Sequence, residues 1–163
     1  MQQQKLSTGL KILLVIGLVA TGLLLIAPDQ ARAQDQCHKI NTTQTSVINA
    51  DFVAVGEFKS GLLKGTSKFT GDLNSLKPIP DPESPLASSY MGILEITTGK
   101  GTLTTRGIGV FETVPSGIGV QFDRVIGGTG LFAGADGFLY YTFTADETGA
   151  AFTSVVSGEI CVN

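Results

Sequence analysis

After residue 33, hydrophobic and polar residues alternate in short segments, which is the pattern of half-buried β-strands. The segments are rich in Val, Ile, Thr, Phe and Tyr, and Gly, Asn, Asp and Pro separate them. No convincing helical period is present in this region. The pattern predicts eight strands, at residues 38–48, 51–59, 62–73, 90–97, 102–113, 118–126, 137–144 and 151–162.

The connections between these segments are mostly short and contain turn residues. Residues 60–61, 99–101, 115–117 and 146–149 have the composition of hairpin turns. The longer link at 74–89 contains KPIPDPESP, whose four prolines prevent it from pairing as a central strand. Short turns imply antiparallel pairing of sequential strands. Without helices to cover a face, such strands form a sandwich or a closed barrel.

Two cysteines favour closure into a barrel. Cys37 and Cys161 lie near the two ends of the strand-rich region and are the only cysteines of the chain. In an exported protein an isolated pair favours a disulfide, and this one requires the first and last strands to be neighbours. The expected fold is therefore all-β, an eight-stranded antiparallel closed barrel whose lumen is filled by side chains or holds one small ligand.

The first 33 residues have the organisation of a targeting signal. Lys5 and Lys11 precede the apolar run 12–27, and Ala31-Arg32-Ala33 follows it. We expect cleavage after Ala33 and a single barrel domain at 34–163, secreted or periplasmic. A retained membrane anchor is the alternative, because the run approaches spanning length. No second apolar run of that kind follows, so no membrane span is expected in the mature chain.

Charge and residue counts narrow the classes of function. Without residues 1–33 the chain has eight Lys or Arg against thirteen Asp or Glu, scattered rather than clustered, and it contains no Trp. Nucleic-acid binding is therefore not expected. The single histidine, His38, does not allow a His-rich zinc site and is expected to be an exposed terminal residue. We expect no metal and no cofactor.

The segment GGTGLFAGADG at 127–137 has five glycines in eleven residues. It lacks the G-x-G-x-x-G spacing of a dinucleotide loop and the Gly-Lys-Ser/Thr of a phosphate loop, and a strand rather than a helix follows it. We interpret it as a turn at a barrel end, where glycine permits positive φ and apolar side chains pack beneath the barrel. The residues with this structural role are Gly127, Gly128, Gly130, Phe132, Gly134 and Gly137.

This same segment resembles the G-G-T/S-G-x-F-x-G-A-x-G segment of allene oxide cyclase and dirigent-like barrels. The resemblance implies an eight-stranded antiparallel barrel with a largely apolar lumen, often assembled as a trimer. It implies little about activity. Where dirigent proteins usually continue A-R-G-Y, this chain has Ala135-Asp136-Gly137-Phe138, and the dirigent acidic position corresponds to Phe122. The acidic catalytic residue of allene oxide cyclases has no assignable counterpart, and a shared barrel does not imply a shared reaction.

Candidate ligand-binding residues are polar side chains within otherwise apolar strands: Glu95, Arg106, Asp123, Arg124, Tyr140 and Tyr141. Period two places Tyr141 on a face with Leu139 and Phe143, and Tyr140 on the opposite face. The charged residues either face solvent or form a lumenal pair of one Arg, 106 or 124, with Asp123 or Glu95. Gly107 and Gly109 share a face of their strand and indicate tight bends or close approach. No catalytic residue is assigned.

Three functions remain open. The first is a non-enzymatic exported barrel that binds a small apolar ligand or a protein partner. The second is an isomerase or cyclase that acts on an apolar oxygenated substrate in the lumen, which needs a lumenal carboxylate or Tyr beside a pocket of roughly 300 Å³ or more. The third is a structural or assembly protein of the cell envelope, with a filled lumen and an apolar outer patch.

Overall fold

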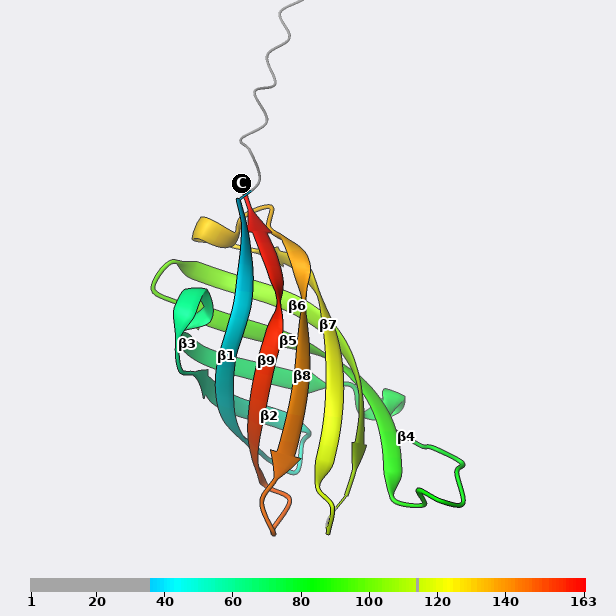
Figure 1. Ribbon diagram of the computed structural model, residues 1–163. Helices are drawn as coiled ribbons and strands as arrows, with labels where there is room; N and C mark the ends of the chain where they lie inside the picture. The colour runs from blue at the N-terminus through cyan, green and yellow to red at the C-terminus, as the bar shows by residue number, and fades with distance from the viewer. Residues whose placement is uncertain (1–35, 114) are drawn as a thin grey trace, which may run out of the picture. The chain divides into compact units, whose positions relative to one another are not determined.

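The computed structural model describes residues 36–113 and 115–163, and these form an antiparallel β-barrel (Figure 1). The predicted signal segment, residues 1–33, lies outside the described residues. The elements are β1 Gln36–Ile48, β2 Val53–Phe58, η1 Gly61–Leu63, β3 Gly65–Gly71, η2 Leu73–Ser75, β4 Lys77–Pro78, β5 Ala87–Thr98, β6 Gly101–Glu112, β7 Ile118–Gly128, η3 Gly130–Phe132, β8 Asp136–Ala145 and β9 Ala151–Val162, where η marks a 3-10 turn.

Eight of the nine strands close the barrel, as the sequence predicted. The hydrogen-bonded order is β3-β2-β1-β9-β8-β7-β6-β5, and pairing of β3 with β5 completes the circle. All of these pairings are antiparallel. Within the predicted link at 74–89, the proline-rich stretch contributes β4, two residues that pair with Ser88 and Ser89. Residues 87–89 were also assigned to the link, but they form the start of β5. The prolines thus leave this segment outside the closed ring.

The disulfide between Cys37 and Cys161 is confirmed. It joins β1 to β9, where the two cysteines are directly opposite each other in the antiparallel register. The first and last strands of the barrel are therefore linked covalently as well as by their hydrogen bonds. Figure 1 shows this end of the barrel, where β1 begins and β9 ends, beside the 3-10 turn that joins β7 to β8.

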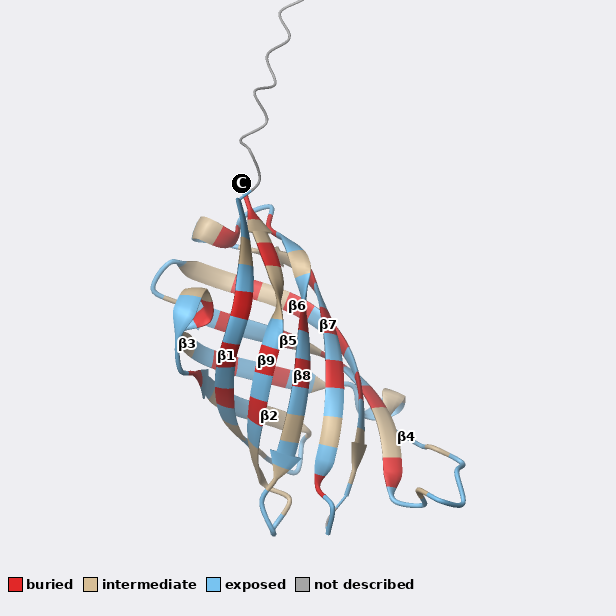
Figure 2. Cartoon of the chain, in the orientation of Figure 1, coloured by how far each residue is buried: buried red, intermediate tan, exposed pale blue. Residues whose placement is uncertain are grey.

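Side chains alternate between lumen and exterior along each strand, and Figure 2 shows this as alternating buried and exposed residues. On β8, Leu139 and Tyr141 are buried while Phe138 and Tyr140 are exposed. The predicted faces of this strand are confirmed. The inward side chains form one apolar cluster that includes Ile40, Phe58, Leu94, Ile96, Leu139, Val156 and Ile160.

The glycine-rich segment forms the turn that the sequence predicted. Residues Gly130–Phe132 make the 3-10 turn η3 between β7 and β8, and the Phe132 side chain is fully buried. Gly130 has φ 59° and Gly134 has φ 75°, a left-handed conformation that other residues rarely adopt. Gly127 and Gly137 also have positive φ, and a Cβ on Gly128 would lie 2.6 Å from the Phe132 Cβ.

Candidate functional site

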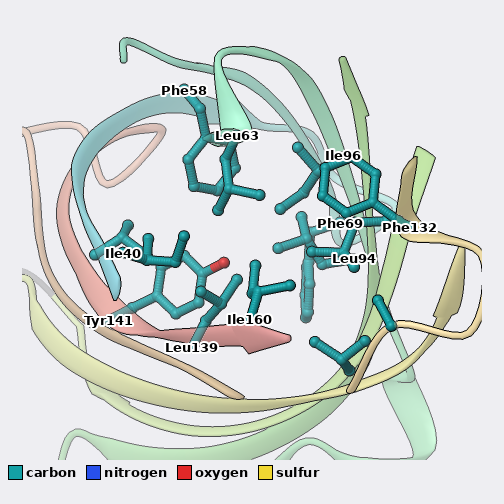
Figure 3. Packing of buried hydrophobic residues seen from close by; sticks show 14 of the residues in the cluster. Ile40, Phe58, Leu63, Phe69, Leu94, Ile96, Phe132, Leu139, Tyr141 and Ile160 are labelled. Carbon is teal, nitrogen blue, oxygen red and sulfur yellow. The ribbon is translucent and has the colours of Figure 1, made fainter. Parts of the chain in front are cut away.

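One end of the lumen is closed by two similar turns. Leu63 of η1 and Phe132 of η3 are both fully buried, and their side chains enter the apolar cluster from the two turns (Figure 3). The turns have related sequences, SGLLKG at 60–65 and TGLFAG at 129–134. In each, a glycine with positive φ precedes the apolar pair, and the second member of the pair becomes the plug.

The other end of the lumen contains a cavity of about 280 Å³. It lies toward the β1–β2 and β8–β9 turns, where its half-buried rim includes Ile48, Phe52 and Gly149. Seven of the lining residues are aromatic: Phe52, Phe69, Tyr90, Phe111, Tyr141, Phe143 and Phe152. Its polar contributors include Gln44, Ser46, Gln121 and Ser154, and no Lys, Arg or His is among the described residues that line it.

A buried polar network crosses the lumen beside this cavity. The Tyr90 hydroxyl donates to Gln121 Oε1 at 2.6 Å, and Gln121 Nε2 donates to Asp123 Oδ1 at 2.6 Å. The Thr105 hydroxyl donates to Asp123 Oδ2 at 2.5 Å. Asp123 is fully buried, and within residues 36–113 and 115–163 it has no ion-pair partner. Neutral donors alone therefore hold this carboxyl group in place.

Two glycines of β6, the strand between β5 and β7, make room for this network. A Cβ on Gly107, which pairs with Asp123 across β6 and β7, would lie 2.0 Å from Asp123 Oδ1. A Cβ on Gly109 would lie 2.3 Å from the Tyr90 ring. The predicted close approach at Gly107 and Gly109 is thus present, but the approaching groups are polar side chains of the lumen and not the backbone that was expected.

Burial shifts the proton affinity of the three ionisable groups in the lumen. Desolvation raises the pKa of Asp123, although the hydrogen bonds from Thr105 and Gln121 oppose this shift. Burial, together with the nearby Asp123 charge, raises the pKa values of Tyr90 and Tyr141 above their usual range. Both tyrosines therefore retain their protons at neutral pH and are hydrogen-bond donors rather than bases.

The Tyr141 hydroxyl has an unusual position. Tyr141 is 3% exposed and pairs with Gln121 across β7 and β8, so its side chain points into the lumen, as Figure 3 shows. Its ring packs edge-on against Phe58, with centroids 6.5 Å apart. Among the described residues its hydroxyl is the buried side-chain polar atom without a hydrogen-bond partner. Leaving such a group unsatisfied costs about 1–3 kcal/mol.

Phe52 contributes a strained aromatic wall at the rim. It is the non-glycine residue of the described chain with positive φ, at 60°, which is costly for a bulky side chain. The Asn49 side chain stabilises the loop, because its Oδ1 accepts hydrogen bonds from the backbone N–H groups of Asp51 and Val53. The Phe52 ring lies edge-on to Phe69 and Tyr90, at 6.1 and 5.7 Å. In this conformation the half-buried Phe52 ring lines the cavity.

The structure separates the six predicted candidates into two groups. Asp123 and Tyr141 are in the lumen, whereas Glu95, Arg106, Arg124 and Tyr140 are exposed on the outside of the barrel. The predicted lumenal Arg–carboxylate pair is therefore wrong. Arg124 follows Asp123 directly and so points to the opposite face. Arg106 pairs in register with Arg124, also on the outer face.

Tyr90 and Gln121 were not among the candidates that the sequence predicted. Gln121 lies two residues before Asp123 in β7, so period two places both side chains on one face, which was a usable signal. Tyr90 shares parity with Leu94 and Ile96, which marks its side chain as inward-facing. The hydrogen bond between Tyr90 and Gln121 joins β5 to β7, two strands apart in the barrel, and no local pattern predicts it.

Comparison with solved structures finds a likeness of low sequence identity. The chain is similar to the pterocarpan synthase dirigent protein GePTS1, with 13% sequence identity and a TM-score of 0.42. The match covers 84% of this chain and 95% of that chain. No protein-family model and no curated protein matches the chain. The family suggested by the glycine-rich segment therefore stays a prediction.

Within the described residues, no helix has the length and apolar character needed to cross a membrane.

Cys37, Glu159 and Cys161 are close enough together to suggest a metal site. Both sulfur atoms belong to the disulfide, however, and neither is a thiolate that would bind a metal ion.

Proposed function

We propose that this protein is an exported β-barrel that binds one small apolar molecule in its lumen. The observation that carries the proposal is the contrast between the two ends of the barrel. One end is plugged by Leu63 and Phe132, whereas the other keeps a cavity of about 280 Å³ with aromatic walls. Protein interiors are normally close-packed, so a barrel selected for stability alone has no reason to leave this space.

The cavity limits the size and polarity of the ligand. Its volume is near the lower end of the range for small-molecule pockets, roughly 300–1,000 Å³. Its walls are mainly Phe and Tyr rings with a few neutral polar groups. A compact molecule with one or two rings suits this space better than a long flexible chain.

Export is supported by the predicted signal segment and by the disulfide. Disulfides such as Cys37–Cys161 persist in oxidising compartments and are rare in the cytosol. We therefore place the mature barrel, residues 34–163, in a secreted or periplasmic location.

A matched pair of variants on one strand tests lumenal binding. Ser154 lines the cavity and Ser157 is exposed on the outer face of the same strand, β9. Ser154→Leu fills the cavity, whereas Ser157→Leu adds the same side chain outside. With methylnaphthalene as the probe in equilibrium dialysis, we expect the wild type and Ser157→Leu to bind and Ser154→Leu to bind at least tenfold more weakly. Equal binding by the two variants, or no binding by the wild type, rejects the proposal.

A second candidate function is an isomerase or cyclase that acts on an apolar oxygenated substrate. The observation in its favour is that Tyr141, Tyr90 and Asp123 lie together beside the cavity. A protonated tyrosine would stabilise negative charge that develops on a substrate oxygen. Incubation with an apolar epoxide, followed by chromatography, tests this candidate. A product of unchanged mass that the wild type forms and Tyr141→Phe does not form supports catalysis, and unchanged epoxide leaves binding as the function.

Self-assembly is a third proposal, supported by the outer face of β6–β9. This face exposes a band of apolar residues: Ile108, Val110, Ile118, Val120, Phe122, Phe138, Tyr140 and Val155. Such bands mark interaction surfaces. Arg106 and Arg124 lie side by side on this face without an ion-pair partner among the described residues, and Glu112 lies farther along β6 on the same face. A second copy of this chain would supply both apolar cover and the opposite charge.

Native mass spectrometry tests self-assembly. We expect an oligomer for the wild type, a trimer if the resemblance to dirigent-like barrels extends to assembly. Phe122→Asp is expected to dissociate it, whereas Thr45→Asp, on the exposed polar face of β1, is expected to leave it intact. A monomeric wild type at the concentrations used for binding rejects this proposal and leaves lumenal binding unaffected.

A further inference from the structure

The polar groups of the cavity differ in whether their hydrogen bonds are already used. Gln44 donates to Ser67 at 2.8 Å, and the Tyr90 hydroxyl donates to Gln121 at 2.6 Å. Tyr141 also lines the cavity, but its hydroxyl donates to no group in residues 36–113 and 115–163. Because buried polar groups in proteins almost always have a partner, this hydroxyl calls for one that the barrel does not supply.

The charge of the lumen limits what this partner is. No basic side chain is among the described residues that line the cavity, so a carboxylate or phosphate that entered would lose its hydration without gaining a counter-ion. Asp123, which is hydrogen-bonded to the cavity residue Gln121, acts electrostatically on Tyr141, and its carboxylate has the same sign as such a ligand. Anionic ligands are therefore disfavoured by both desolvation and repulsion.

We propose that the lumen selects uncharged apolar ligands that carry one hydrogen-bond acceptor, such as a ketone or ether oxygen, and that Tyr141 donates the hydrogen bond to this oxygen. The proposal rests on the lumenal binding proposed above and adds the head-group chemistry. The ring system of the ligand contacts the aromatic walls that include Phe52, Phe111 and Phe143, and the acceptor oxygen lies at the deep side of the cavity beside Tyr141.

Three probes with the same ring system separate these contributions: methyl naphthyl ketone, methylnaphthalene and naphthoate. They offer a neutral acceptor, no acceptor and an anion, respectively. Equilibrium dialysis gives the dissociation constant of each for the wild type and for two variants. Tyr141→Phe removes the lumenal hydroxyl, whereas Tyr140→Phe removes the hydroxyl of the neighbouring exposed tyrosine and is the matched control.

We expect the wild type to bind the ketone about three- to tenfold more tightly than methylnaphthalene, the range that one buried hydrogen bond supplies. Naphthoate is expected to bind at least tenfold more weakly than the ketone. Tyr141→Phe should abolish the preference for the ketone while it retains methylnaphthalene binding, and Tyr140→Phe should behave as the wild type. Retained methylnaphthalene binding also shows that the lumen of the variant is intact.

The results that overturn the inference fall into two distinguishable groups. If the wild type binds methylnaphthalene but shows no preference for the ketone, or if Tyr141→Phe keeps that preference, the lumen binds apolar ligands without the proposed head-group recognition. Tight binding of naphthoate has the same consequence. If the wild type binds none of the three probes, the proposed function itself is wrong, and the head-group inference is rejected with it.

Discussion

Gly107→Ala tests whether glycine in β6 exists to make room for the lumenal carboxyl group. The added Cβ would lie 2.0 Å from Asp123 Oδ1 and 2.9 Å from Gln121 Nε2. Both atoms belong to one hydrogen bond of 2.6 Å, so displacing either one alone weakens or breaks it. Overpacking costs about 1–3 kcal/mol, and a lost hydrogen bond to a charged group about 1.5–3 kcal/mol. Because the two effects overlap, we expect a total loss of about 2–4 kcal/mol in the free energy of unfolding.

Urea denaturation measures this loss, and Gly99→Ala is the matched control. Gly99 lies in the turn between β5 and β6, where an added Cβ meets no atom within 4 Å. We expect this control to change stability by about 0.5 kcal/mol or less. Asp123→Ala removes the clashing atoms, so the double variant with Gly107→Ala should lose less than the sum of the single losses. Additive losses, or a Gly107→Ala variant as stable as Gly99→Ala, would refute the steric explanation.

Three further predictions concern the lumen and its closure. The raised pKa of Asp123 means that the folded protein binds the proton of this carboxyl group more tightly than the unfolded chain does. As pH falls through the folded pKa toward the unfolded value of about 3.9, the stability of the wild type should therefore rise relative to that of Asp123→Asn. Urea midpoints measured across this pH range test the prediction. Phe132→Ala should cost about 3–5 kcal/mol, and clearly more than Leu131→Ala, because Phe132 is fully buried; thermal unfolding compares the two variants. Replacement of Cys37 and Cys161 by Ser should lower stability by up to about 4–5 kcal/mol, the loop-entropy value for their separation of 124 residues; reduction of the wild type should match this loss in the same denaturation assay.

The barrel was predictable because its strand and turn signals are local and one cysteine pair links its two ends. Period-two alternation defined the strands, short turns required antiparallel neighbours, and the cysteines required that the first and last strands meet. The two-residue strand β4 was missed because its pairing with Ser88 and Ser89 lies within a proline-rich link. The plug at Leu63 was also missed, since 62–73 was assigned wholly to a strand. The similarity of SGLLKG to TGLFAG was a usable signal. Once TGLFAG was interpreted as a turn that buries Phe132, the same interpretation of SGLLKG would have predicted the burial of Leu63.

The site was only partly predictable because the sequence gives each face of a strand but not which face is the lumen. Asp123 and Arg124 were both candidates, and only closure of the barrel decides that the carboxyl group points inward. In β7 the outward side chains include Ile118, Val120 and Phe122, whereas the inward ones include Gln121 and Asp123. Hydrophobicity alone would therefore have selected the wrong face of this strand as the lumen.

That inversion has a physical explanation in the distribution of glycine. The inward face of β6 contains Gly107 and Gly109, which contribute no apolar side chain and leave space into which the Asp123 and Tyr90 side chains extend. Burial of a carboxyl group is costly unless donors surround it, and here Thr105 and Gln121 are the donors. Such an arrangement does not increase stability over an apolar core. A polar network kept at this cost, beside a cavity and a Tyr141 hydroxyl that has no partner among the described residues, supports the proposal that a ligand uses the lumen.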